Sequence, residues 1–364
     1  MGLEKVVAFV DLDYFFAQVE EVERPELAGK PVVVCVYSGR TEDSGVVSTA
    51  NYPARRYGVR AGIPIKRAKK LLPPDAVFLP IRLQHYTKVS RHVMSILAKY
   101  ADGMRIESID EAVLDITHRV GGDFDRAAEY VAGMKMEVLR ATGLSCSVGV
   151  APNRVVAKIA ADVSKPDGLR VVKPEEVEDF LSRLPVNSIP GIGSKTAASL
   201  AEMGIQTVKD LKQLSLEALE KLFGRKRAEY IYFAARGKYD EPVKPRPPPK
   251  QVSRIITLKR NTRDVEDVIG ELSRAVADGL ARMEALQAAA SRVGAVAITS
   301  DLRTITRQEE IRPGTPYEDV LKILRKLFQE ILQQDGRLQL RRAGVRFSDF
   351  VSQAGQSTLT GYVE

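Results

Sequence analysis

The chain has 364 residues and a formal net charge of +8 at pH 7. Hydrophobic residues make up 44% and charged residues 28%, a balance typical of a folded globular protein and not of a disordered one. This length exceeds one ordinary core, so we expect about two to four domains. Apolar runs are too short for a signal peptide or a membrane helix, which predicts a cytoplasmic protein without a membrane partner.

The first half of the chain predicts alternating strands and helices. An apolar run predicts a buried strand over Val6–Leu12, and Phe16, Val19 and Val22 follow at helical spacing. Further strands are expected at Pro31–Val36, Val46–Thr49, around Asp110-Glu111 and at Cys146–Val150, and helices after Asn51 and at Leu83–Tyr100, Asp125–Ala141 and Asn153–Asp162. This order indicates a small antiparallel α+β sheet. Cys35 and Cys146 fall in the apolar runs and are expected in the core.

The second half begins with a helical region, Lys173–Tyr239, interrupted by Pro190-Gly191-Ile192-Gly193. Proline-rich Asp240–Lys250 follows and is predicted to be an extended tether. The remaining elements are a strand (Val252–Leu258), a helix (Val265–Leu286), two strands (Arg292–Thr299, Leu302–Ile311), a helix (Tyr317–Gln334) and a strand (Leu338–Phe347). That β-α-β-β-α-β order predicts a second α+β unit.

Positive charge is concentrated in two acid-free stretches of the chain. Pro242–Arg263 contains seven basic residues, and Arg337–Arg346 contains Arg341, Arg342 and Arg346 on a strand-like segment. Each run alone is compatible with a solvated linker or an exposed sheet face. Two such runs in one part of the chain favour a nucleic acid as the partner.

Three carboxylates lie at positions where burial of an acid costs free energy. Asp11 ends the first apolar run, and Asp110-Glu111 lies between short apolar segments. Acids at buried strand ends require a neutralising cation, for which a divalent metal is the natural candidate. Asp110 and Glu111 can reach one centre only if the backbone turns there. A polar hairpin is the alternative explanation, and Asp13, just before a helix, is expected to be an N-cap.

Four ordered motifs resemble the Y-family translesion DNA polymerases, of the archaeal DinB or DNA polymerase IV type. They are Phe9-Val10-Asp11-Leu12-Asp13-Tyr14-Phe15-Phe16-Ala17-Gln18-Val19-Glu20, Thr49-Ala50-Asn51-Tyr52-Pro53-Ala54-Arg55, Ser108-Ile109-Asp110-Glu111-Ala112 and Lys158-Ile159-Ala160-Ala161-Asp162. The similarity extends through the Pro190–Gly193 hairpin and the strand Arg341–Phe347. The resemblance implies template-directed, error-prone translesion synthesis by a nucleotidyltransferase, with primer-template DNA and a deoxynucleoside triphosphate as partners.

The fold implied by this resemblance is an α+β right-hand polymerase. It would combine a ferredoxin-like palm, small fingers, a helical thumb with a helix-hairpin-helix, and a tethered βαββαβ little finger. The implied boundaries are palm 1–14 and 82–170, fingers 15–81, thumb 171–237, basic linker 238–250, little finger 251–350 and tail 351–364. A monomer is expected.

The resemblance also implies roles for the acids. Asp11, Asp110 and Glu111 correspond to the catalytic and metal-binding acids, and the backbone carbonyl of Leu12 would complete the shell of one ion. Two Mg²⁺ ions are the implied cofactor, with Mn²⁺ left open. Attack of a primer 3′-hydroxyl on the α-phosphate would release pyrophosphate.

The implied nucleotide-binding residues are Phe15, Phe16, Thr49, Tyr52, Arg55 and Lys165. Phe16 corresponds to a steric gate that excludes the ribose 2′-hydroxyl, and core packing of its ring is the alternative. For the polar members the alternative is an ordinary exposed side chain.

The implied DNA-binding residues are Gly191, Gly193, Ser194 and Lys195 in the hairpin and Arg341, Arg342 and Arg346 in the last strand. The tail residues Gln356, Leu359, Tyr362 and Val363 fit a sliding-clamp peptide, with a disordered terminus as the alternative. Two other functions are alternatives. A non-enzymatic DNA-binding scaffold would not require all three acids, and a nucleotide cyclase would require neither a thumb nor a basic tethered domain.

Overall fold

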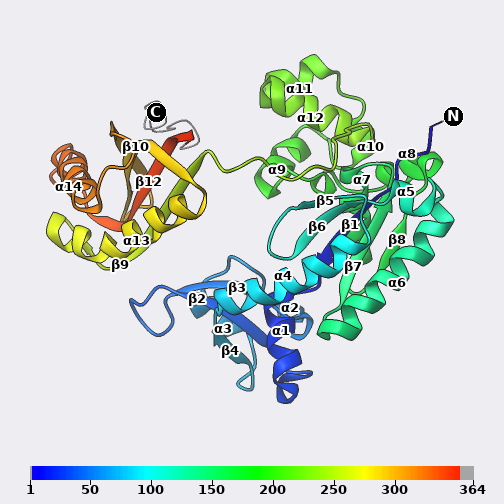
Figure 1. Cartoon of the computed structure of the whole chain (residues 1–364), viewed down its shortest axis with the longest axis horizontal. Helices are drawn as coiled ribbons and strands as arrows, with labels where there is room; N and C mark the ends of the chain where they lie inside the picture. The colour runs from blue at the N-terminus through cyan, green and yellow to red at the C-terminus, as the bar shows by residue number, and fades with distance from the viewer. Residues whose placement is uncertain (1, 353–364) are drawn as a thin grey trace, which may run out of the picture. The chain divides into compact units, whose positions relative to one another are not determined.

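A computed structural model describes residues 2–352, which divide into two compact units. The first unit contains the chain up to Val36 and Val46–Arg246, and the second contains Tyr37–Gly45 and the chain from Pro247 onward. Both units mix helices with sheets (Figure 1), as the α+β prediction requires.

The central sheet of the first unit has the strand order β5-β6-β1-β7-β8. These strands are β1 (Val7–Leu12), β5 (Gly103–Ile106), β6 (Glu111–Asp115), β7 (Cys146–Ala151) and β8 (Leu169–Val171). Neighbouring strands are antiparallel except β7 and β8, which run parallel. The predicted antiparallel sheet thus gains one parallel strand, because the helix between β7 and β8 forms a crossover that returns the chain in the same direction.

Strand β1 is buried along its whole length because helices cover both faces of the sheet. Ala8 and Val10 pack into one core together with residues of α4 (Leu83–Lys99) and α6 (Phe124–Thr142). Val7 and Phe9 point the other way and pack with residues of α7 (Arg154–Ser164). An uninterrupted apolar strand is the sequence signature of such two-sided burial. A short helix, α5 (Thr117–Val120), follows β6.

A smaller sheet with the order β3-β2-β4 lies in the same unit. It consists of β2 (Val32–Tyr37), β3 (Gly45–Ala50) and β4 (Val77–Pro80), with helices α1 (Phe15–Glu23), α2 (Tyr52–Arg56), α3 (Ile65–Leu71) and the 3-10 turn Pro25–Leu27 beside it in sequence. Its core contains Cys35, while Cys146 lies in the core of the central sheet. Both cysteines are therefore buried, as predicted.

The region from Lys173 to Tyr239 forms helices and no strand, as expected. It contains α8 (Val177–Ser182), α9 (Ser194–Glu202), α10 (Val208–Leu211), α11 (Leu216–Phe223), α12 (Arg225–Ala235) and the 3-10 turns Pro174–Glu176 and Val186–Ser188. Its apolar side chains belong to the same core as Val7, Phe9 and α7. The helical region is therefore fixed to the central sheet by shared packing.

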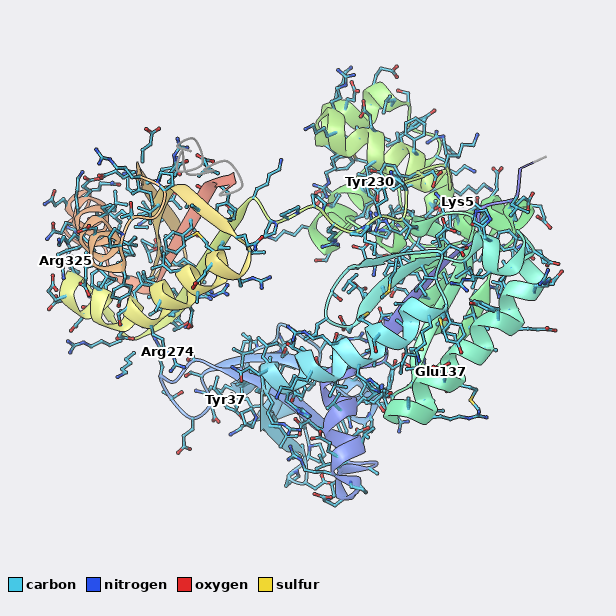
Figure 2. The ribbon with its side chains drawn as sticks, in the orientation of Figure 1. Lys5, Tyr37, Glu137, Tyr230, Arg274 and Arg325 are labelled. Atoms are coloured by element: carbon cyan, nitrogen blue, oxygen red, sulfur yellow. The ribbon has the colours of Figure 1, made fainter. Side chains whose placement is uncertain are left out.

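The predicted tether is only partly free. No helix or strand forms over Tyr239–Lys250, yet its first half packs on the first unit. Lys5 pairs with Asp240, and the ring of Tyr230 lies 4.8 Å from that of Tyr239 (Figure 2 labels Lys5 and Tyr230). The acidic residues at the start of the segment therefore bind its first half to the first unit, a contact that the sequence pattern did not reveal.

Two acids and three arginines form the main attachment. Glu241 pairs with Arg105 at 3.1 Å and with Arg154 at 3.2 Å. Glu107, whose side chain is 7% exposed, pairs with Arg105 at 2.7 Å and also with Arg246 from the linker. We call these five residues the linker anchor. It joins the linker to strand β5 and to the start of α7.

The second unit has the sheet order β11-β10-β12-β9. Its elements are β9 (Gln251–Thr262), α13 (Val265–Ala285), β10 (Ala288–Thr299), β11 (Thr304–Glu310), α14 (Tyr317–Gln333) and β12 (Leu340–Ser352). Ala343, Val345 and Phe347 of β12 face a core shared with both helices. A Cβ atom at Gly279 would lie 2.7 Å from the Phe347 ring, so this glycine lets α13 approach the sheet. The β-α-β-β-α-β prediction is confirmed.

Among the described residues, no helix has the length and apolar character needed to cross a membrane.

Candidate active site

The pairing of β1 with β6 brings the three predicted acids together. Asp11 is opposite Glu111 in the register, and the N–H of Leu12 donates to the carbonyl of Asp110 at 2.9 Å. The chain turns just before β6, where the N–H of Glu107 donates to the carbonyl of Glu111 at 2.9 Å. That turn is the backbone reversal which the sequence analysis required for adjacent acids to serve one centre.

The three acids differ in burial and in partners. Asp11 is 6% exposed, whereas Asp110 and Glu111 are only partly buried. Ser108 Oγ donates to Asp110 Oδ1 at 2.5 Å. Burial raises the pKa of Asp11 to about 7, although Lys165 opposes the rise, and Glu111 and Asp110 add to it. Any additional positive charge would stabilise the ionised form of a carboxyl group in these surroundings.

Two lysines supply the positive charge at this site. Lys165 Nζ lies 2.6 Å from Asp11 Oδ2, and Lys158 Nζ lies 2.5 Å from Glu111 Oε1. Burial would lower the pKa of Lys165, but the charge and hydrogen bond of Asp11 raise it above its usual value. Lys158 also lies 4.4 Å from the centre of the Phe9 ring. No site role was predicted for Lys158 from the sequence.

The donor atoms suit a hard divalent cation, because all of them are oxygens. In residues 2–352, however, no three His, Cys, Asp or Glu side chains are already arranged as a set of metal ligands. The carboxylates point instead to lysine and serine partners. Metal binding would therefore require the ammonium groups to move away from the acids.

Asp13 is not the predicted N-cap. Tyr14 occupies that position in a left-handed conformation, and no side chain caps α1. The Asp13 carboxylate is 1% exposed and accepts from Ser145 Oγ and Ser147 Oγ, both at 2.8 Å. It also accepts from the N–H of Asp167 at 2.9 Å. Asp13 thus fixes the turn that carries Lys165.

The four polar residues predicted to contact the triphosphate are distributed over three segments. Thr49 lies in β3, Tyr52 and Arg55 in α2, and Lys165 in the turn after α7. The Arg55 guanidinium lies 5.0 Å from the centre of the Tyr52 ring. The Tyr52 hydroxyl is buried and has no hydrogen-bond partner among the described residues, and burial raises its pKa.

Asn51, for which no role was predicted, caps the start of α2. Its side chain is fully buried and accepts from the N–H groups of Ala54 and Val32, both at 3.0 Å. Its amide donates to Glu21 Oε1 at 2.6 Å. Asparagine before a short helix is a recognised cap signal, so this role could have been predicted.

The two phenylalanines at the start of α1 are placed differently. Phe15 is 2% exposed and part of the core, so its ring is not available to a ligand. Phe16 is partly buried, and its ring stacks on that of Tyr86, with centroids 4.5 Å apart and an interplanar angle of 15°. Core packing and ligand contact are therefore both compatible with Phe16.

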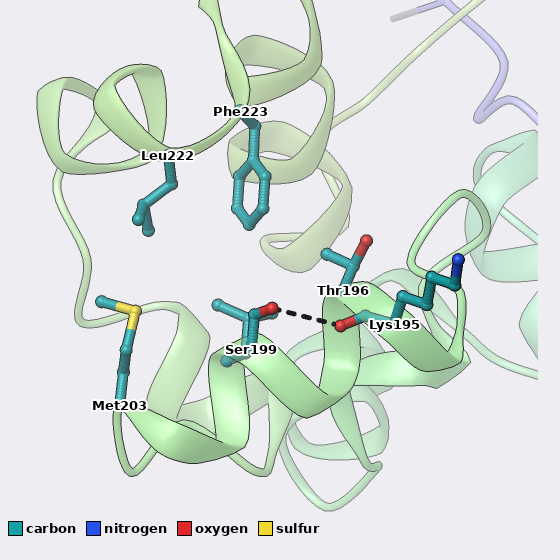
Figure 3. Close-up of a pocket in the computed structure, with 7 residues that line it drawn as sticks. Lys195, Thr196, Ser199, Met203, Leu222 and Phe223 are labelled. Atoms are coloured by element: carbon teal, nitrogen blue, oxygen red, sulfur yellow. Dashed lines mark hydrogen bonds between the residues drawn. The ribbon is translucent and has the colours of Figure 1, made fainter.

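The glycine hairpin precedes α9 as predicted. Gly191 has a φ of +89°, and Gly193 is the N-cap residue of α9. Arg227 donates to the carbonyl of Gly191 and to Thr196 Oγ1, both at 3.0 Å. Lys195 is exposed, and Figure 3 shows its ammonium group pointing away from the apolar side chains of Met203 and Leu222. The exposed end of the hairpin is thus basic.

The three arginines of β12 do not share one environment. Arg342 and Arg346 lie on the face of the sheet opposite Ala343, Val345 and Phe347, while Arg341 lies at a register irregularity next to β9. Arg342 is exposed, and the Nε of Arg346 is buried without a hydrogen-bond partner in the described part of the chain. The predicted clamp residues Gln356, Leu359, Tyr362 and Val363 lie outside the described residues.

Comparison with known proteins identifies the family. The impB/mucB/samB family matches residues 10–162, the thumb domain of DNA polymerase iota matches 187–239, and the impB/mucB/samB C-terminal domain matches 249–360. The DNA polymerase IV of Metallosphaera sedula is 45% identical, over 94% of this chain and 95% of that protein. That of Nitrosopumilus maritimus is 41% identical, over 98% of this chain and 99% of that protein.

Solved structures agree. A Y-family DNA polymerase chimera, Dbh-Dpo4(243-245)-Dbh, has a TM-score of 0.89 and 42% identity and covers 95% of this chain and 99% of its own. An insertion ternary complex of Dbh DNA polymerase has a TM-score of 0.67 and 41% identity, with the same coverage. The chain belongs to the Y-family of DNA polymerases, in the DNA polymerase IV group. It is accordingly a DNA-directed DNA polymerase.

Proposed function

We propose that this chain performs error-prone translesion synthesis by two-metal-ion transfer of a nucleotide from a deoxynucleoside triphosphate to a primer 3′-hydroxyl. One observation carries the proposal: Asp11 and Glu111 are opposite each other in adjacent strands, with Asp110 hydrogen-bonded to Leu12 at the same strand end. Family membership supplies the reaction class, and this juxtaposition supplies the residues.

Asp11, Asp110, Glu111 and the carbonyl of Leu12 would hold two divalent ions. Mg²⁺ fits because it prefers oxygen ligands and keeps waters and phosphates in its shell, and Mn²⁺ shares that preference. When bound, the ions would lower the pKa of the attacking hydroxyl and stabilise the leaving oxygen. The role of the acids would be to hold the ions in place, and Lys158 and Lys165 would give up their contacts with Glu111 and Asp11.

The triphosphate would bind Tyr52, Arg55, Thr49 and Lys165. Support comes from the Tyr52 hydroxyl, a buried donor without a partner in residues 2–352, which a phosphate oxygen would satisfy. Lys165, once released from Asp11, has a full positive charge to place on the same anion. In this proposal the Phe16 ring lies against the sugar and rejects a 2′-hydroxyl, whereas Phe15 contributes only backbone contacts.

DNA would be held by its backbone without sequence readout. The proposed contacts are Gly191, Gly193, Ser194 and Lys195 in the hairpin and Arg341, Arg342 and Arg346 in β12, and binding should weaken as salt rises. We assign palm, fingers, thumb, linker and little finger to the ranges given above. We also propose a monomer that binds a sliding clamp through its C-terminal residues.

Primer extension on undamaged and abasic templates tests the proposal. Asp110→Ala should abolish extension, and a chelator should abolish it in the wild type, with Mg²⁺ or Mn²⁺ restoring it. Glu129→Ala, which removes an exposed carboxylate from α6, is the matched control and should extend normally. Retained synthesis by Asp110→Ala would refute the assigned mechanism.

A further inference from the structure

A fully buried carboxylate lies behind Phe16, outside the site described above. Glu20 has no exposed side-chain surface, and it lies one helical turn after Phe16 on the same face of α1. Its Oε1 accepts from Arg82 Nε at 2.7 Å, and its Oε2 pairs with Arg24. A buried charge with this number of directed partners is held in one geometry.

Tyr86 connects this carboxylate to Phe16. The Tyr86 side chain, on α4, is fully buried, and its hydroxyl donates to Glu20 Oε1 at 2.6 Å. Its ring covers one face of Phe16 in the stacked arrangement described above. The hydroxyl and the ring face are both engaged, so Tyr86 can move only if Glu20 or Phe16 moves with it.

We propose that Glu20, Arg82 and Tyr86 position the Phe16 ring and thereby set the discrimination between deoxyribonucleotides and ribonucleotides. This inference rests on the gate role of Phe16 in the proposed function. A gate made of one phenyl ring rejects a hydroxyl only if the ring cannot tilt away from it. Stacking on Tyr86 blocks that tilt on one side, and the hydrogen bond to Glu20 keeps Tyr86 from yielding.

The charge distribution supports a positioning role over a simple packing role. An apolar residue at position 20 would fill a core as well and would avoid the desolvation of a charge. Arg82 continues outward to Glu23 at 2.5 Å, so the buried carboxylate is linked to a surface ion pair. The network therefore fixes the relative placement of α1 and α4, the two helices that carry Phe16 and Tyr86.

The test measures the ratio of kcat/KM for a deoxynucleoside triphosphate to that for the matching ribonucleoside triphosphate. Phe16→Ala should lower this ratio by about 100-fold if Phe16 is the gate. Tyr86→Leu should lower it by about 3- to 10-fold through loss of the stack. Tyr86→Phe and Glu20→Gln, which keep the ring and the volume, should each lower it by about 2- to 3-fold.

A double-substitution cycle separates positioning from general damage. In the Phe16→Ala background, Tyr86→Leu should change the ratio no further, because the ring that it positions is gone. Tyr130→Leu is the matched control: it removes one ring of another aromatic pair, with Tyr100 at 5.4 Å, and should lower the melting temperature without moving the ratio.

The outcomes are distinguishable. An unchanged ratio in Phe16→Ala would refute the gate role and with it the proposed sugar selection. A lowered ratio in Phe16→Ala together with an unchanged ratio in Tyr86→Leu would overturn the positioning inference alone. Equal effects of Tyr86→Leu in both backgrounds would also overturn it.

Discussion

Two groups of buried or partly buried acids in the first unit are neutralised in different ways. Asp11 and Glu111 are paired with Lys165 and Lys158. Glu20 and Glu107 are paired with arginines, two in the first case and three in the second. Both groups lie close to the sheet and helices that carry the proposed reaction, but one is paired with flexible ammonium groups and the other with planar guanidinium groups.

In the proposed function the lysine-paired acids must exchange their partners for metal ions, whereas the arginine-paired acids keep theirs. An ammonium group is a point charge on a flexible stem, so another cation can replace it. A guanidinium group donates in a fixed planar fork and holds a carboxylate in one orientation. We infer that the lysine-paired acids can exchange their lysine partners for metal ions, and that the arginine-paired acids support the structure. Substitutions should therefore affect the rate of nucleotide transfer in the lysine-paired group, and stability, together with the sugar discrimination that Glu20 supports, in the arginine-paired group.

The largest expected effect is on catalysis in the lysine-paired group. Asp11→Asn keeps the shape of the side chain but removes the charge, and activity should fall by at least about 100-fold. Because burial raises the pKa of Asp11, the uncharged amide should leave the melting temperature unchanged or higher in metal-free buffer. Single-turnover extension and calorimetry measure the two quantities. A parallel loss of stability would contradict the division into two groups.

Glu107→Ala should have the largest effect on stability. Arg105 and Arg154, with side chains 15% and 17% exposed, would lose the shared carboxylate, at a cost of about 3 kcal/mol in the free energy of unfolding of the first unit. Denaturant titration followed by circular dichroism measures the change. Glu129→Ala is again the matched control, and equal midpoints for the two variants would refute the structural role.

Tyr52→Phe should have a moderate and purely functional effect. Its hydroxyl has no partner in the described structure, so removing the hydroxyl should not destabilise the protein. If a phosphate oxygen accepts from it, KM for the nucleotide should rise by about 3- to 10-fold with kcat unchanged. Steady-state kinetics measure both constants, and an unchanged KM would show that Tyr52 does not contact the triphosphate.

The smallest expected effect is a pH dependence of the linker anchor. Burial alone would raise the pKa values of Glu107 and Glu241, but hydrogen bonds and the nearby arginines lower both below the ordinary 4.5. An acid with a lowered folded-state pKa contributes stability above its unfolded pKa and loses it as pH falls through the folded value. Glu241→Gln should therefore lower the melting temperature slightly at pH 7, and the difference should vanish well below pH 4.5. A difference that persists there would contradict this account.

The sequence predicted what depends on local pattern. The apolar run of β1 predicted a buried strand, and Asp11 and Asp110-Glu111 were singled out because acids beside buried apolar residues require a neutralising cation. Asp13 was assigned wrongly because its partners Ser145 and Ser147 lie more than a hundred residues away in the chain. Helical spacing placed Phe16 on a buried face but could not reveal the ring that lies against it.

The anchored half of the linker has a property that its ion pairs do not explain. Glu241, Lys244 and Arg246 each stand directly before a proline. A residue in that position is excluded from helical backbone angles, and the proline itself has a fixed φ. The unbound segment is therefore already extended, and it gives up little backbone freedom when it docks. A linker with the same charges and glycines in place of the prolines would lose more entropy on docking and should detach more readily.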